Sequence, residues 1–361
     1  MSNSATRVIV GLSGGVDSSV TAYLLQQQGF DVQALFMKNW EEDDTSEHCA
    51  ASQDIQDCER VCEHLKIPLH IVNFSREYWQ NVFESFLQEY ASGRTPNPDI
   101  LCNQMIKFDS FLKHAKTLGA EVIATGHYAQ KTQQQGYYML QKALDPAKDQ
   151  TYFLHRLNQA QLAASLFPLG KMHKTAVRQL AQQLGLATYQ KKDSTGICFI
   201  GERKFKTFLQ SYLPAQPGII VDITGKELGK HEGVIYYTIG QRQGIGIGGQ
   251  IGSSGEPWYV ADKDLQTNTL IVVQGKQHPR LYRRELTFSN AHWVAGKPAD
   301  LPLPCTAKIR YRQIEQACLV TPGNAADTFH VAFTDPQWAV TPGQAIVLYQ
   351  GENCLGGGFI Q

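Results

Sequence analysis

Short apolar runs alternate with stretches of helical periodicity along about the first 200 residues of the chain. The apolar runs predict strands at residues 7–12, 31–37, 69–74 and 121–125. The periodic stretches predict helices at residues 18–28, 54–65, 76–90 and 104–118. Strands that alternate with helices indicate an α/β fold with a parallel sheet covered on both faces. Ligands of such sheets bind at the carboxyl ends of the strands.

From about residue 205 the helical periodicity gives way to short β-rich runs separated by Gly and Pro turns. These runs predict strands at residues 218–223, 234–239, 258–260, 269–273, 305–311, 328–333 and 345–349. The pattern is typical of one or two small β domains. We therefore expect an α/β domain over residues 1–204, a central β-rich domain over 205–280 and a C-terminal β domain over 281–361.

Composition limits the partners and the compartment of the protein. The chain has 361 residues, and its 33 Lys and Arg residues balance 33 Asp and Glu residues. A net charge of zero argues against a polyanion ligand, because nucleic-acid-binding proteins usually carry a basic excess. The N-terminus lacks the basic and apolar regions of a secretory signal, and no apolar run approaches the roughly 20 residues of a membrane helix. We expect a cytoplasmic protein without a membrane partner.

The eight cysteines give little indication of a metal site or a disulfide scaffold. No Cys-x-x-Cys pair occurs, which argues against a zinc ribbon or a thioredoxin-type motif. Cys58 and Cys62 are one helical turn apart. Together with Cys49 they lack an obvious fourth metal ligand, although His48 and His64 are nearby in sequence. We interpret these cysteines as structural and predict no metal site.

A glycine-rich segment between the first predicted strand and helix is the sharpest local feature. Its sequence is Ser13-Gly14-Gly15-Val16-Asp17-Ser18. Adjacent glycines let backbone amides approach an anion, and a helix N-terminus adds unpaired N–H groups and a positive dipole end. The carboxylate of Asp17 suits a Mg²⁺ ion that bridges phosphate oxygens. The alternative is an ordinary strand-to-helix turn, because Ser, Gly and Asp favour turns and caps.

A second candidate segment, residues 93–103, holds two prolines close to Cys102. Since the next predicted helix begins at Gln104, we expect Cys102 to lie near a helix N-terminus, which favours the thiolate. Asp99 is placed to act as a base or to orient a neighbouring group. The alternative for Cys102 is a small buried side chain, and the residues around Cys198 favour that interpretation for it as well.

Five motifs occur in the order found in tRNA-specific 2-thiouridylases. They are SGGVDS (13–18), TPNPDILCN (95–103), ATGHYA (124–129), KDQTYFL (148–154) and STGICFIGER (194–203). The glycine-rich segment taken alone resembles the PP-loop of the ATP pyrophosphatases. The resemblance to the thiouridylases covers nearly the whole chain, including GQRQGIGIGG (240–249) in its β-rich part.

The resemblance implies three domains and an ATP site. It implies a Rossmann-like adenine nucleotide α-hydrolase (PP-loop) domain, a small β-rich central domain and a C-terminal β-barrel that contacts tRNA. The implied ATP-binding residues are those of the loop and two flanking positions. They are Gly11, Leu12, Ser13, Gly14, Gly15, Val16, Asp17 and Ser18, with Met37 at the adenine slot and Gly126 on the other side of the nucleotide.

The resemblance also implies the chemistry of 2-thiouridine formation at the wobble position of tRNA. AMP is transferred from ATP to the C2 oxygen of uridine, and a persulfide on Cys198 then attacks C2. Cys102 is the nucleophile that breaks the sulfur–sulfur bond, which leaves a disulfide between Cys102 and Cys198. An external reductant then reduces this disulfide. Asp99 is the acidic residue of the Asp-x-x-Cys motif. Two alternatives to attack by the persulfide stay open. Sulfur could leave Cys198 as hydrosulfide before it attacks C2, or the reaction could depend on an iron–sulfur centre bound by Cys102, Cys198 and Asp99. The implied persulfide donor is a sulfur-relay protein or a cysteine desulfurase.

Three segments are the implied contacts to tRNA. Asn97, Pro98 and Asp99 face the target base, and the other contacts are Lys148, Asp149 and Gln150 in the first domain and Tyr311 and Arg312 in the last. Alternation around Ile309 and Tyr311 predicts that Lys308, Arg310 and Arg312 share one face of a strand, which is either a tRNA contact or a solvated face.

Two other functions are weighed beside the thiouridylase. One is another PP-loop enzyme that uses a nitrogen nucleophile, which leaves Cys102 and Cys198 without a role. The other is a non-catalytic adenine-nucleotide-binding module, which would tolerate the loss of both cysteines.

Overall fold

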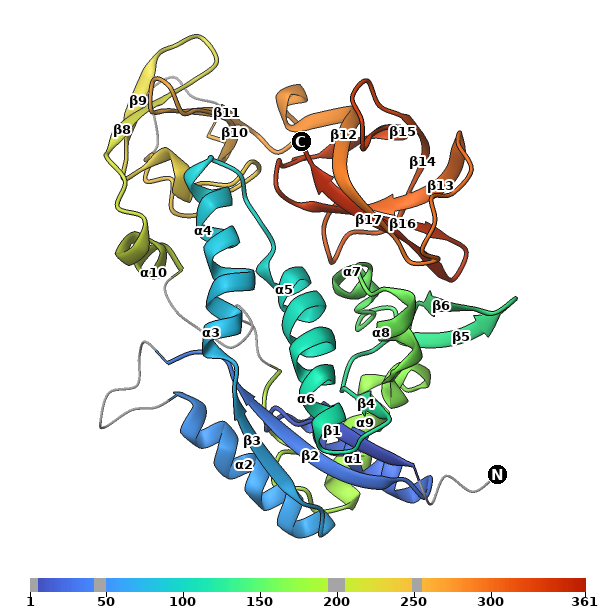
Figure 1. The fold of residues 1–361 in the computed structure, drawn as a ribbon. Helices are drawn as coiled ribbons and strands as arrows, with labels where there is room; N and C mark the ends of the chain where they lie inside the picture. Colours follow the sequence, from blue (N-terminus) through green and yellow to red (C-terminus); the bar gives the residue numbers. More distant parts are fainter. Residues whose placement is uncertain (1–5, 42–49, 194–204, 249–254) are drawn as a thin grey trace.

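The structure is a computed structural model that describes residues 6–41, 50–193, 205–248 and 255–361. Figure 1 shows an α/β part that is followed by a small sheet and a β-barrel. The described residues form a five-stranded, a four-stranded and an eight-stranded sheet. None of the helices in these ranges combines the length and the apolar composition that crossing a membrane would require.

The five-stranded sheet is parallel and confirms the α/β fold predicted for the first part of the chain. Its order is β3 (Leu69–Asn73), β2 (Asp31–Lys38), β1 (Arg7–Gly11), β4 (Val122–Ala124) and β7 (Ser165–Leu166). Val8, Ile9 and Val10 in the central strand are fully buried, as expected for a parallel strand covered on both faces.

Helices cover both faces of this sheet. The face of Val8 and Val10 packs against α1 (Val16–Gln27), α2 (Ala50–Leu65) and α9 (Lys174–Gln183). The face of Ile9 packs against two long, aromatic-rich helical stretches. The first stretch consists of α3 (Ser75–Tyr78), the π-helical η1 (Trp79–Phe83) and α4 (Glu84–Ala91), and the second of α5 (Pro98–Leu101), the π-helical η2 (Cys102–Ser110) and α6 (Phe111–Thr117). Short helices complete this part: α7 (Thr151–Leu154), α8 (Gln159–Ala163) and η3 (Pro168–Lys171).

The second stretch begins at Pro98, six residues earlier than predicted. Asn97 is its N-cap, and the Oδ1 atom of Asn97 accepts a hydrogen bond from the backbone N–H of Asp99 at 3.1 Å. Proline at the first helical position suits the fixed φ of its ring. Cys102, which was predicted to lie near a helix N-terminus, is the fifth residue of this helical stretch. Cys102 lies in the second turn, and the dipole effect falls off within the first.

The four-stranded sheet of the central part is built on the order β10 (Trp258–Asp264), β11 (Thr269–Gln274), β8 (Gly218–Val221) and β9 (Glu227–His231). It is preceded by α10 (Phe205–Tyr212). The strand predicted at residues 234–239 is wrong, because Val234–Tyr236 form one 3₁₀ turn, η4. Tyr236 and Tyr237 are both buried, an arrangement that the period of two in a half-buried strand does not allow.

Six antiparallel strands close the C-terminal barrel through a pairing of its first and last strands. They are β12 (Tyr282–Trp293), β13 (Leu303–Lys308), β14 (Gln316–Pro322), β15 (Thr328–Trp338), β16 (Ala345–Gln350) and β17 (Asn353–Ile360), with η5 (Pro279–Leu281) before them. Glycines in β17 permit the closure. A Cβ atom at Gly356 would lie 2.0 Å from the backbone oxygen of His292, and one at Gly358 would lie 2.4 Å from that of Ser289.

The α/β part and the barrel share one sheet. The hairpin of β5 (Gln130–Gln134) and β6 (Tyr137–Gln141) extends the barrel sheet through pairing of β6 with β17, beneath the barrel in Figure 1. The side chain of Gln141 donates to that of Asn353 at 2.9 Å. The buried hydroxyl of Tyr152 donates to the backbone oxygen of Ala345 at 2.9 Å. These contacts fix the barrel beside the first sheet.

We predict that Tyr152→Phe lowers the free energy of unfolding by about 1 kcal/mol, because it removes one buried hydrogen bond between the α/β part and the barrel. Urea denaturation measures the change. Tyr137→Phe is the matched control, since Tyr137 is 46% exposed. Equal stability of Tyr152→Phe and the wild type would show that this bond does not stabilise the docked barrel.

Candidate functional site: a phosphate-type loop and its cations

The glycine-rich loop connects the end of β1 to the start of α1 and is held by its own serines. The backbone N–H of Ser13 donates to Ser18 Oγ at 3.2 Å, and Ser18 Oγ donates to the backbone oxygen of Gly15 at 3.1 Å. Gly15 is the N-cap of α1 and supplies no side-chain cap. The first amides of a helix have no intrahelical acceptor, so those of α1 are presented to a ligand.

Close backbone contacts explain why two positions of the site are occupied by glycine. Gly14 has a φ of +68°, and a Cβ there would lie 2.7 Å from the backbone oxygen of Asp54. A Cβ at Gly126 would lie 2.8 Å from the backbone nitrogen of Ser18. Gly126 follows β4, so the ends of two strands converge on the start of α1. A Cβ at Gly11 would lie 3.3 Å from Met37 Cε, which puts the predicted adenine-slot residue beside the loop.

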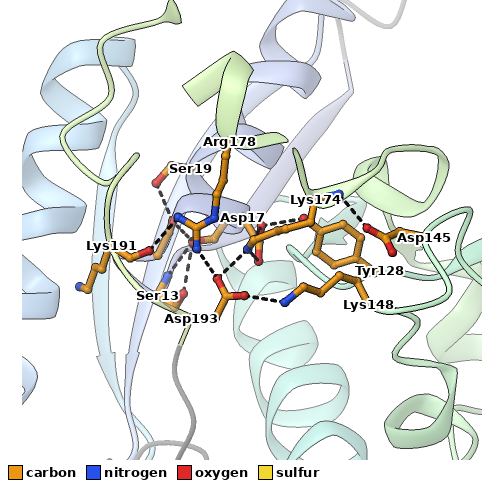
Figure 2. A network of polar contacts seen from close by, with 12 residues as sticks. Ser13, Asp17, Ser19, Tyr128, Asp145, Lys148, Lys174, Arg178, Lys191 and Asp193 are labelled. Carbon is orange, nitrogen blue, oxygen red and sulfur yellow. Dashed lines mark hydrogen bonds and ion pairs between the residues drawn. The ribbon is translucent and has the colours of Figure 1, made fainter. Parts of the chain in front are cut away.

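The carboxylate of Asp17 is bound by a buried lysine and a buried tyrosine (Figure 2). Lys174 Nζ lies 2.8 Å from Oδ1 and 2.7 Å from Oδ2 of Asp17, and Lys174 is 7% exposed. The Tyr128 hydroxyl donates to Asp17 Oδ1 at 2.8 Å. Burial and the adjacent Asp17 carboxylate raise the pKa of Tyr128, so the phenol keeps the proton that it donates.

A second carboxylate, that of Asp193, binds three cations beside Asp17 (Figure 2). Lys148 Nζ donates to Asp193 Oδ2 at 2.7 Å, while Lys174 Nζ and Arg178 Nη2 each lie 2.8 Å from Oδ1. Burial raises the pKa of Asp193, but the hydrogen bonds from Lys148 and Lys174 outweigh it and lower the pKa to about 2. Asp193 is therefore an anion at neutral pH.

The sequence analysis did not identify Lys174, Arg178, Tyr128 or Asp193 as site residues. Lys174 lies 157 positions after Asp17, and no local motif links the two. The available signal in the sequence was the pair of cations Lys174 and Arg178, four residues apart at the start of a helix. Positions i and i+4 share one helix face, so such a pair could bind one anion. Tyr128 lies within the ATGHYA motif, of which only Gly126 was selected.

Cys102 and Asp99 lie at the start of the second aromatic-rich helical stretch. Cys102 is fully buried in the hydrophobic cluster on the Ile9 face of the sheet. Asp99 is partly exposed and lies one turn before Cys102. Cys198 lies outside the described residues. The neighbouring Asn103 is also buried, and its Oδ1 atom has no hydrogen-bond partner among the residues that the structure describes.

Asp149 and Gln150, in the predicted tRNA-contact segment 148–150, use their side chains in internal hydrogen bonds. Asp149 is 5% exposed and accepts hydrogen bonds from the backbone N–H of Ala143 at 3.1 Å and from the Thr151 hydroxyl at 2.8 Å. The side-chain oxygen of Gln150 accepts from the backbone N–H of Tyr128 at 2.9 Å. Asp149 and Gln150 thus hold the loops that carry Lys148 and Tyr128.

The strand face predicted for Lys308, Arg310 and Arg312 is wrong, because β13 ends at Lys308 and the chain turns. Arg310 donates to the backbone oxygens of Ile239 and Ala339, each at 3.0 Å. Lys308 is nearly buried, 3.7 Å from Asp149. Within this trio, Arg312 alone is exposed.

The turn after β13 reaches the α/β part through Tyr311. Its ring centroid lies 4.4 Å from that of Phe153, in the segment that follows Lys148, Asp149 and Gln150. The structure therefore brings the two predicted tRNA-contact regions, one in each domain, next to each other.

Cys58 and Cys62 are buried in the hydrophobic cluster that contains Val8 and Val10. Burial raises the pKa of Cys62 to about 12 and raises that of Cys58 further. Both thiols therefore stay protonated, as the structural interpretation requires. Within the described ranges, no group of three or more His, Cys, Asp or Glu side chains is placed to hold a metal ion.

Family models match the chain in three consecutive pieces. Residues 6–202 match the tRNA methyl transferase HUP domain, residues 206–274 match the tRNA methyl transferase PRC-barrel domain, and residues 283–360 match the aminomethyltransferase beta-barrel domain. A crystal structure of a 4-thiouridine synthetase–RNA complex with bound ATP matches with a TM-score of 0.37 and 18% identity over 58% of this chain and 50% of that chain, which is too low to establish a shared fold.

Curated relatives match over nearly their full length. The tRNA-specific 2-thiouridylase MnmA of Idiomarina loihiensis is 57% identical over 100% of this chain and 97% of its own length. The enzyme of the same name from Hydrogenovibrio crunogenus is 58% identical over 99% of this chain and 94% of its own length. With this identity over the whole fold, and with the loop geometry described above, the chain belongs to the tRNA-specific 2-thiouridylase family.

Proposed function

We propose that this protein is a tRNA-uridine 2-sulfurtransferase that uses ATP to replace the C2 oxygen of the wobble uridine by sulfur. The observation that carries the use of ATP is the preformed loop at the start of α1. Gly126 contacts the backbone of this loop at Ser18, and Lys174 contacts Asp17 beside it. The transfer of sulfur to the uridine is supported by the family and by the motifs around Cys102 and Cys198. A tRNA substrate fits a cytoplasmic enzyme.

The loop favours thiolation over the methyl transfer that the family models name. Methyl transfer from a sulfonium donor leaves no phosphate group to bind. Glycine amides and a helix N-terminus form a cradle for an anion, and here a buried lysine stands beside them. A nucleoside triphosphate is the ligand that uses the glycine amides, the helix N-terminus and the buried lysine together.

In this proposal ATP lies along the carboxyl edge of the parallel sheet. Residues Gly11 to Ser18 hold the phosphates, Met37 lies at the adenine and Gly126 bounds the nucleotide on the opposite side. The two flanking residues approach the loop from β2 and from the end of β4, which agrees with a ligand placed between these strand ends.

Asp17 fits a single-oxygen contact to Mg²⁺. A carboxylate offers about four acceptor positions, and Lys174 and Tyr128 occupy three of those of Asp17. Mg²⁺ is usually held by one or two carboxylates together with substrate phosphates, so a larger cluster of acidic residues is not required. Bound there, the ion would neutralise charge on the phosphates.

The sulfur step follows from the chemistry of the uridine carbonyl. Its oxygen leaves badly, and attachment of AMP to that oxygen, with release of pyrophosphate, makes a good leaving group. The terminal sulfur of a Cys198 persulfide attacks C2 and AMP departs. The Cys102 thiolate then attacks the Cys198 sulfur and breaks the sulfur–sulfur bond. Sulfur stays on the base, the two cysteines form a disulfide, and an external dithiol reduces it. Asp99, one turn from Cys102, would accept the proton of the thiol or orient the base.

The turn after β13 and the Lys148 segment form the proposed tRNA surface, with Asn97, Pro98 and Asp99 at the target base. Lys148 and Arg312 supply positive charge that is at least partly exposed, and the Tyr311 ring of the turn packs on Phe153. The net charge of zero is compatible with this surface, because a few local cations suffice to position an RNA backbone.

We expect Asp17→Ala to lower AMP formation in the presence of tRNA by at least about a hundredfold, because it removes the proposed Mg²⁺ contact and the partner of Lys174. Release of labelled AMP measures the rate. Asp31→Ala is the control, since Asp31 pairs with Arg7 on the surface. An unchanged rate in Asp17→Ala would contradict the Mg²⁺ role.

Cys102→Ala and Cys198→Ala should each abolish thiolation with a persulfide donor, while release of pyrophosphate in a single turnover persists, because adenylation uses neither thiol. Nucleoside analysis of the tRNA measures the product. Cys305→Ala, in the barrel, is the control and should retain activity. Full thiolation by either variant, or activity only after iron is loaded, would overturn the persulfide scheme.

Arg312→Ala should weaken tRNA binding and reduce the slope of log affinity against log salt by about 1, because it removes one phosphate contact. Arg310→Ala should instead lower stability, since the guanidinium holds two backbone oxygens. Filter binding across a salt series separates the two. A salt slope that Arg312→Ala leaves unchanged would remove this residue from the tRNA surface.

A further inference from the structure

Three cations converge on one carboxylate beside the phosphate-type loop. Lys148, Lys174 and Arg178 all lie within 2.8 Å of an Asp193 oxygen, and Figure 2 shows them pointing at it, Lys174 and Arg178 from α9 and Lys148 from the loop before α7. Lys174 also reaches Asp17, so the cluster continues directly into the loop. With two carboxylates and three cations, the cluster keeps one excess positive charge.

The backbone fixes these cations independently of Asp193. Lys174 is the first residue of α9, and its backbone N–H donates to Asp145 Oδ2 at 2.9 Å. The helix packs through Val177 and Ala181 into the core under α1. Lys174 and Arg178 thus stay in place whichever anion lies between them.

Asp193 is the replaceable member of the cluster. Its side chain is 34% exposed, as is that of Arg178, whereas that of Lys174 is 9% exposed. Ion pairs that water reaches are weak, so another anion displaces such a carboxylate at low cost. A phosphate offers more acceptor oxygens than a carboxylate and suits the planar fork of an arginine.

We propose that Asp193 is an internal stand-in for phosphate. It occupies a subsite of Lys148, Lys174 and Arg178, and the β- and γ-phosphates of the nucleotide displace it when ATP binds. This inference rests on the proposed ATP site and adds to it a built-in competitor. The apparent affinity for the triphosphate is thereby the intrinsic affinity multiplied by the fraction of molecules in which Asp193 has left the subsite.

The test compares ATP, inorganic pyrophosphate and AMP as ligands of the full-length protein by isothermal titration calorimetry. Asp193→Asn should bind ATP and pyrophosphate about tenfold more tightly than the wild type, because the competitor loses its charge. AMP lacks the β- and γ-phosphates, so its affinity should stay within about twofold. Lys174→Gln should lose pyrophosphate binding in both backgrounds.

Asp54→Asn is the matched control for the loss of one negative charge near the loop. Asp54 pairs with Lys191, which keeps Asp57 as a second partner, and the three cations of the subsite stay paired. Its pyrophosphate affinity should stay within about twofold of the wild type. An equal gain in Asp54→Asn would show a general charge effect and overturn the proposal.

Two further outcomes separate this inference from the proposed function. If the wild type binds ATP but Asp193→Asn, folded by its melting temperature, binds pyrophosphate equally or more weakly, Asp193 is an anchor for the cations and the stand-in is wrong. If the wild type binds neither ATP nor AMP, the proposed ATP site itself is wrong.

Discussion

The buried ammonium of Lys174 is the contact on which the arrangement of the site depends. It lies between Asp17 at the start of α1 and Asp193 after α9, and it is 7% exposed. Without it two carboxylates would face each other beside an anion-binding loop, which like-charge repulsion and desolvation both oppose. One cation therefore lets acidic and phosphate-binding groups share the carboxyl edge of the sheet. Its placement depends in turn on the packing of α9 against α1.

The barrel reaches this edge because the fold does not separate into independent parts. The hairpin of β5 and β6 belongs to the first 204 residues, yet it extends the barrel sheet. The glycines of β17 allow the barrel to close, and Tyr152 ties it to α7. The turn after β13 is thereby held against Phe153, only a few residues after Lys148. A polyanion that contacts both regions would bind along one continuous surface.

Local patterns in the sequence predicted the parallel sheet, the loop and the β-rich second half, because each leaves a signal within a few residues. The start of the helix at Pro98 also had a local signal, an Asn before a Pro, but the helix was predicted to begin at Gln104. Alternating charges around Ile309 were taken for a strand, although the same spacing occurs in the turn after β13. Contacts such as Lys174 with Asp17, 157 positions apart, depend on tertiary packing that no local pattern encodes.

The two halves of the proposed reaction make opposite demands on their surroundings. Adenylation needs a charged cradle that is ready before the nucleotide binds, and the serine-held loop with its buried lysine meets this need. Sulfur transfer needs water kept away from a persulfide and an activated base. Cys102 is fully buried among aromatic side chains on the opposite face of the sheet from α1. The helix that carries the loop and the helix that carries Cys102 thus lie on opposite faces of the parallel sheet, and both faces reach the edge where its strands end.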